Sequence, residues 1–166
     1  MRPVEHTPTE PSDYAALSLA YGSLVAVLAA SARDREAIEP KELLPLSAAT
    51  FALSKLIVRE KAETWIRRPF VEEAPDEARP RGRGLRYAIG ELLTCTRCTG
   101  AWSALSLVGL RLYAPRTART VTAVLAASAG NDLLQAGFSW LCARATTQQH
   151  EAETGGRGLL SRRRAA

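Results

Sequence analysis

Histidine and cysteine are scarce in this sequence, and their scarcity limits the chemistry to expect. The two histidines, His6 and His150, lie in polar segments near the two ends of the chain. Histidine-based catalysis among the predicted helices is therefore not expected. Three cysteines do not make a disulfide framework. The sequence also lacks a serine–histidine–acid arrangement and a metalloprotease motif.

Motifs for nucleotides and nucleic acids are missing as well. The segment Arg81-Gly82-Arg83-Gly84 does not follow a predicted strand, so it is not a phosphate-binding loop. The net charge is +5, but zinc-finger spacing and aromatic residues within a basic stripe are absent, so nucleic acid is not an expected partner. No segment alternates in the manner of a strand, and no internal repeat occurs. The predicted fold class is all-α.

Four apolar runs separate the charged segments and predict an integral membrane protein. Residues 14–32 contain no charge, and a membrane helix needs roughly 18 such residues. The other runs are 43–58, with an amphipathic extension to residue 68, then 95–114 and 117–143. We expect about four transmembrane helices, or three if one run lies in the membrane interface. A soluble helical bundle is the alternative.

A signal peptide is a second alternative for the first run, because Ala30-Ser31-Ala32 resembles a cleavage site. The residues before the run contain one basic side chain, Arg2, and three acidic ones, Glu5, Glu10 and Asp13. A signal peptide needs the opposite charge at its start. We therefore expect the first run to be retained as a membrane helix.

The tails and the distribution of basic residues predict the topology. Residues 1–13 and the basic residues 144–166 are predicted to be disordered, which leaves 14–143 as a helical membrane domain. Eight basic residues lie in segment 59–86 and five in the C-terminal tail, against three and two in the opposite connectors. The positive-inside rule then places both termini in the cytoplasm, with the basic segments on anionic lipid headgroups.

A pair of cysteines stands out within residues 91–102, Glu-Leu-Leu-Thr-Cys-Thr-Arg-Cys-Thr-Gly-Ala-Trp. Cys95 and Cys98 are three positions apart and so share one face of a helical turn. Three interpretations stay open. The pair exchanges disulfides, or binds a metal with Cys142 as a third ligand, or packs closely against another helix with the help of Gly100. No cofactor is predicted.

Lys55 and Asp132 lie inside apolar runs, where a charge is costly. Both are predicted in the cytoplasmic half of the helices, together with Glu91 and the cysteine pair. We therefore expect that Lys55 pairs with Asp132, or that Asp132 faces the Cys95–Cys98 turn. The alternative is that Lys55 reaches the interface and that Asp132 caps a broken helix beside Asn131.

The motif from Gly90 to Trp102 resembles an uncharacterised bacterial family, catalogued as domain of unknown function thirteen-sixty. Two further segments resemble landmarks of that family: Trp65-Ile66-Arg67-Arg68-Pro69-Phe70 and Asn131-Asp132-Leu133-Leu134. The resemblance covers about residues 14–142. Relatives often have a proline or an aromatic residue between the cysteines, where this chain has Thr96-Arg97.

The resemblance implies a small multi-span membrane protein without an established activity, and some relatives in spore-forming bacteria have a sporulation label. Its motifs add Glu91, Trp102, Arg67, Pro69 and Phe70 to the candidate functional residues. We expect a structural or partner-binding protein, with the lipid bilayer and an unidentified protein as partners, and not an enzyme. The alternative is a membrane-bound thiol redox or metal-binding protein.

Overall fold

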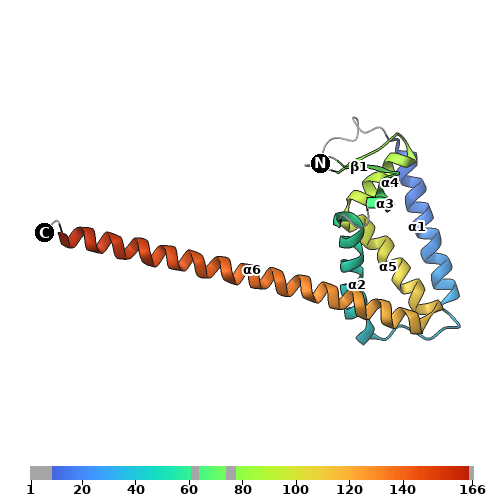
Figure 1. Ribbon diagram of the computed structural model, residues 1–166. Helices are drawn as coiled ribbons and strands as arrows, with labels where there is room; N and C mark the ends of the chain where they lie inside the picture. Colours follow the sequence, from blue (N-terminus) through green and yellow to red (C-terminus); the bar gives the residue numbers. More distant parts are fainter. Residues whose placement is uncertain (1–8, 61–63, 74–77, 165–166) are drawn as a thin grey trace. The chain divides into compact units, whose positions relative to one another are not determined.

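The computed structural model describes residues 9–60, 64–73 and 78–164, with the side chains of Glu73 and of residues 148–164 outside that description. The chain divides into two compact units, Met1–Ala129 and Gly130–Ala166, and each is described by itself. The first unit contains every element up to the first turns of the last helix (Figure 1). The second unit is the remainder of that helix.

The first two helices, α1 (Pro11–Ser31) and α2 (Pro40–Arg59), begin in the same way. Each has a proline at its first position, where the missing N–H has no helical partner to lose. In each, the glutamate before the proline exchanges hydrogen bonds with an acidic residue three positions later, and this capping box satisfies two backbone donors. The pairs are Glu10 with Asp13 and Glu39 with Glu42.

A short region of tight turns follows α2. It contains α3 (Thr64–Arg67) and a hairpin of two antiparallel strands, β1 (Val71–Glu73) and β2 (Ala78–Pro80), in which Val71 lies opposite Pro80. Helix α4 (Leu85–Thr94) begins after Gly84, whose φ of 60° favours glycine. The hairpin packs on α4. This region lies at the end of the first unit where α1 begins (Figure 1).

One extended residue, Cys95, separates α4 from α5 (Thr96–Tyr113). Its backbone angles are φ −105° and ψ 110°, so the helical hydrogen-bond ladder stops there. The sulfur of Cys95 accepts a hydrogen bond from the N–H of Cys98 at 3.4 Å, which caps α5. The hydroxyl of Thr99 donates to the carbonyl of Leu92 at 2.7 Å and so satisfies a carbonyl at the end of α4.

The core lies between α2 and α5, which pack antiparallel. Leu46 and Ala49 of α2 and Leu107 of α5 form its buried centre. Small residues such as Ala49 and Ser103 let the two backbones approach closely. Helix α6 (Pro115–Arg164) adds Val121 and Leu125 from its first turns to the same cluster.

Helix α1 differs from α2 and α5 because none of its residues is buried. Large apolar side chains such as Leu19 and Val27 are 71% and 63% exposed. Among the described residues, α1 is the one helix that is long and apolar enough to cross a membrane by length and composition. The other three predicted runs do not reach that threshold, so the number of spans stays a prediction.

The all-α class is confirmed, although the β1–β2 hairpin lies in a segment with no predicted strand. The end of the second run differs from the prediction. The second run does not continue as one helix to residue 68, because α2 ends at Arg59 and Glu60 is extended. The third run, 95–114, agrees with α5 (Thr96–Tyr113) to within one residue at each end.

Helix α6 contains the fourth predicted run and continues to Arg164, through the tail for which the sequence predicts disorder. That tail has no proline to stop a helix once it has formed. At the other end of the chain, residues 1–8 lie outside the described residues, and Pro11–Asp13 of the predicted tail form the first turn of α1.

Candidate functional site

The cysteine motif lines an open groove of about 430 Å³ between α1 and the α4–α5 junction. We call it the motif groove. Four of the candidate residues predicted from the sequence line it: Glu91, Cys95, Cys98 and Trp102. The opposite wall comes from α1 and includes Tyr14 and Tyr21.

A hydrogen bond closes one end of the motif groove. The hydroxyl of Tyr14 donates to the carboxylate of Glu91 at 2.5 Å. The side-chain hydroxyl oxygen of Thr9 lies 2.9 Å from the same Tyr14 hydroxyl. Glu91 is half-buried. The bond joins the start of α1 to α4 and gives the carboxylate a fixed partner.

An aromatic pair supports the middle of the motif groove. The ring centroids of Tyr21 and Trp102 lie 5.4 Å apart, with the ring planes at 68°. This is the edge-to-face arrangement that aromatic pairs prefer. The two rings therefore join the two walls of the groove and hold α1 against α5.

The two motif cysteines lie one helical turn apart at the start of α5. Cys95 is half-buried and Cys98 is exposed, and both are free thiols. Because both line the same groove, a ligand or partner there reaches both sulfurs. Gly100 of α5 faces α2, and an added Cβ there would lie 4.0 Å from Cβ of Ser54, an ordinary contact distance.

The second predicted element, with Arg67, Pro69 and Phe70, lies away from the motif groove and connects α2, the hairpin and α4. Arg67 is 4% exposed, and its guanidinium donates to the carbonyl of Ile57 at 2.6 Å. The carbonyl of Pro69 accepts two bonds from Arg86, at 3.0 and 2.7 Å. The carbonyl of Phe70 accepts the N–H of Arg81 at 2.7 Å. These contacts stabilise the turn after α2.

Lys55 lies on α2 outside the motif groove, and its ammonium is 4.0 Å from the carboxylate of Glu60. Asp132 and Cys142 belong to the second unit, which is described by itself. The predicted contacts of Asp132 with Lys55 or with the cysteine turn thus stay predictions. Within the described residues, no group of three or more possible metal ligands occurs, and the metal site with Cys142 also remains a prediction.

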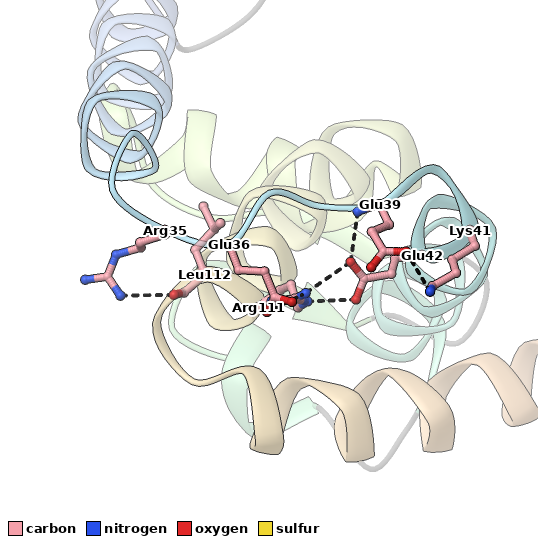
Figure 2. A network of polar contacts seen from close by, with 7 residues as sticks. All are labelled: Arg35, Glu36, Glu39, Lys41, Glu42, Arg111 and Leu112. Atoms are coloured by element: carbon pink, nitrogen blue, oxygen red, sulfur yellow. Dashed lines mark hydrogen bonds and ion pairs between the residues drawn. The ribbon is translucent and has the colours of Figure 1, made fainter.

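Sequence reasoning missed an ion-pair network at the opposite end of α2 and α5 (Figure 2). Arg111 is 8% exposed and donates from Nε to Glu42 at 2.8 Å and from Nη2 to Glu36 at 3.3 Å. The guanidinium holds the pKa of the Glu42 carboxyl below its ordinary value, and the N–H of Glu39 acts in the same direction. The sequence contained one signal for this network, because Arg111 is a charged residue inside the predicted run 95–114.

A second arginine fastens the same end. Arg35, in the connector before α2, donates to the carbonyl of Leu112 at 3.0 Å and lies 4.0 Å from the ring centroid of Tyr113. Figure 2 shows this contact beside the Arg111 network. The connector between α1 and α2 is therefore attached to the end of α5 by two independent arginines.

Comparison with known proteins confirms the resemblance. Residues 45–138 match the model of a family described as "Protein of unknown function (DUF1360)". Over 90 residues the chain is 33% identical to the sporulation protein YjcA of Bacillus subtilis (strain 168), a match that covers 49% of this chain and 76% of that protein. No solved structure matches the chain.

Proposed function

The chain belongs to the DUF1360 family, and from this we propose that it is a small multi-span bacterial membrane protein that binds a protein partner and performs no catalysis. The observation that supports the membrane assignment best is helix α1. It is long and apolar, and none of its residues is buried against the rest of the chain. In water such a surface would be unfavourable, whereas a bilayer would cover it.

The arrangement of charge supports an orientation for the proposed protein. The start of α1, the end of α2 and the hairpin region lie at one end of the first unit (Figure 1). Basic residues gather at that end: Arg59, Arg67, Arg68, Arg79, Arg81, Arg83, Arg86 and Arg97. Acids such as Glu60 and Glu91 lie at the same end, and the opposite end has bases beside Glu36 and Glu42, but acids contribute little to the orientation of a membrane protein. The positive-inside rule then favours the basic end as the cytoplasmic one.

In this proposal, residues 14–32, 43–58 and 95–114 cross the bilayer, and residues 117–143 form a fourth span. If the fourth run lies in the interface instead, the protein has three spans and the C-terminal tail lies outside the cell. In both topologies, residues 41 and 42 lie at the outer surface of the membrane. The ion pair between Arg111 and Glu42 joins the end of α5 to the start of α2 there.

The motif groove is the proposed surface for a protein partner. It is open, and it presents three aromatic rings, a carboxylate and two thiols. Aromatic side chains contribute strongly to protein interfaces when a partner covers them. A groove between loosely packed α1 and the α4–α5 junction suits a single helix or an extended segment of the partner.

Native cysteines provide the test of topology. In a Cys95→Ser, Cys98→Ser variant, Cys142 is the one remaining thiol. After confirming that the protein sediments with membranes and resists carbonate extraction, a membrane-impermeant maleimide is applied to spheroplasts. With four spans, Cys142 reacts only after permeabilisation; with three, it reacts from outside. Complete release of the protein by carbonate would exclude the membrane assignment.

The curated relative is named a sporulation protein, and we extend the proposal to that process where the host forms spores. Deletion of the gene should then lower the yield of heat-resistant spores without slowing vegetative growth. A wild-type copy should restore the yield, whereas a copy with Glu91→Ala and Trp102→Ala in the motif groove should not. A normal spore yield in the deletion strain would count against this extension.

Thiol exchange is the second candidate, supported by the position of Cys95 and Cys98 in one groove, one helical turn apart. In this reaction the two thiols would reduce a partner's disulfide, form the Cys95–Cys98 disulfide and transfer two electrons and two protons to the partner. A Cys98→Ser variant should then trap a mixed disulfide with the partner. Absence of any trapped species, with function intact, would exclude this candidate.

A further inference from the structure

A second pocket, distinct from the motif groove, lies between the last turns of α2 and the first turn of α5. It measures about 420 Å³ and is lined by Phe51, Ser54, Lys55, Arg59, Thr96 and Arg97. We call it the basic pocket. Its residues come from two helices that pack antiparallel, so folding brings Lys55 and Arg59 beside Arg97.

The charge of the basic pocket has one sign. Three of its six lining side chains are cationic, and none is acidic. The carboxylate of Glu60, which is about half exposed and does not line the pocket, lies 4.0 Å from the ammonium of Lys55. Because α5 begins at Thr96, the positive end of its dipole adds to the same field. Such a site attracts anions, and two arginines favour phosphate in particular.

The position of the basic pocket indicates which phosphate it meets. Its apolar wall is Phe51, which is 51% exposed on α2. Arg59 ends α2 at the basic end of the first unit, and Arg97 is exposed beside it. In the proposed topology, these cations lie at headgroup depth in the cytoplasmic leaflet and Phe51 faces the acyl chains.

We propose that the basic pocket binds the phosphate group of an anionic phospholipid headgroup through Lys55, Arg59 and Arg97. The inference rests on the proposed membrane function, since a soluble protein would meet only free phosphate. The bound lipid would fasten the end of α2 to the start of α5.

The test uses the full-length chain in a mild detergent, titrated with a short-chain phosphatidylglycerol while the melting temperature is followed. The first variant is Arg59→Gln with Arg97→Gln, because both side chains are exposed and their loss leaves the core unchanged. The matched control is Arg81→Gln with Arg83→Gln, two exposed arginines at the same end but outside the pocket. Both variants remove the same charge, so diffuse attraction weakens equally.

We expect the pocket variant to bind phosphatidylglycerol about tenfold more weakly than the wild type and the control to bind within about twofold of it. Adding Lys55→Gln should weaken binding further. Equal weakening in the pocket variant and the control would overturn the proposal, because general electrostatic attraction would then explain the binding.

Inorganic phosphate and a short-chain phosphatidylcholine are titrated in the same way as two further ligands. Phosphatidylcholine, whose net charge is zero, should raise the melting temperature little. If inorganic phosphate at the same concentration stabilises the wild type as well as phosphatidylglycerol does, the site takes free phosphate and the lipid assignment is wrong. Fractionation of the same variants tests the membrane function separately. If the protein sediments with membranes but the pocket variant binds phosphatidylglycerol as well as the control does, only the lipid proposal is wrong.

Discussion

The hydroxyl of Tyr14 and the carboxylate of Glu91 are joined by a hydrogen bond across 77 positions of sequence. Tyr14 lies outside residues 45–138, which match the family model, whereas Glu91 lies inside them. The contact therefore fastens the exposed helix α1 to the part of the chain that defines the family.

Replacing Tyr14 with phenylalanine should loosen this attachment. The ring is kept and the hydroxyl is lost, so Glu91 loses its donor, and we expect the free energy of unfolding to fall by about 1–2 kcal/mol. Tyr21→Phe is the matched control, because Tyr21 is on the same helix and its ring contact with Trp102 survives. Thermal unfolding in detergent measures both. Equal stability of the two variants would show that the Tyr14 bond contributes nothing.

Gly90 should not tolerate a side chain. A Cβ at this position would lie 2.5 Å from the carbonyl oxygen of Phe70 and 2.9 Å from Cβ of Pro80. Because the backbone and a proline ring cannot yield easily, Gly90→Ala should cost about 1–3 kcal/mol of stability.

The control for Gly90 is Gly22→Ala in α1, where an added Cβ meets nothing within 4 Å. Alanine favours the helix over glycine, so this variant should gain about 0.5–1 kcal/mol. A loss of stability in Gly90→Ala and a gain in Gly22→Ala, measured in the same unfolding assay, would support close packing of α4 on the hairpin. A neutral Gly90→Ala would contradict it.

Acid should weaken the Arg111–Glu42 pair. The pKa of Glu42 is lowered in the folded protein, so its contribution is fully present above the unfolded pKa of about 4.3 and is lost as the pH falls through the folded pKa. The melting temperature of the wild type should therefore drop below about pH 4.3. Glu42→Gln should melt lower at pH 7 and decline less steeply in acid.

Asp34→Asn is the control for the acid experiment, because Asp34 is exposed in the connector before α2. It removes the same charge and should follow the wild-type pH profile. If Glu42→Gln retains the full acid-dependent decline, other carboxylates account for it and the Arg111 pair is not its source.

A comparison of Cys95→Ser with Cys95→Ala should separate the contribution of Cys95 to helix capping from the chemistry of its thiol. Serine is a good N-cap, so Cys95→Ser should preserve α5, whereas Cys95→Ala should cost about 0.5–2 kcal/mol through loss of the cap. Far-UV circular dichroism with thermal unfolding checks this order. A partner-binding or reductase assay on the stable serine variant then reports on the sulfur itself. Alanine and serine variants of equal stability would exclude a capping role.

The sequence predicted the helical class and most of the motif groove because both follow from local patterns. Apolar runs located α1, α2 and α5 to within a few residues, and the sequence placed Glu91 with Cys95 and Cys98 at the start of the third run. A helical turn brings Cys95 and Cys98 to one face, whereas Glu91 lies on the other side of the extended residue Cys95 and joins them through the turn between α4 and α5.

Contacts between distant segments could not be predicted in this way. Tyr14 and Tyr21 join the groove only through the packing of α1, and Arg111 meets Glu42 only because α2 and α5 are antiparallel. The cap at Cys95 is a local feature, but a cysteine is not a usual N-cap, so the sequence does not predict the extended residue between α4 and α5. Glu42, two residues after Pro40, looked like part of a solvated connector.

The joint between α4 and α5 has a consequence for the evolution of this chain. A single extended residue, Cys95, connects two helices whose directions are set by separate partners: the hairpin for α4 and α2 for α5. One residue added to α5 between Cys95 and its packed face would rotate that face by about 100° relative to the joint, and Leu107 would no longer point at Ala49. We therefore expect the start of α5 to tolerate substitutions during evolution but not insertions or deletions.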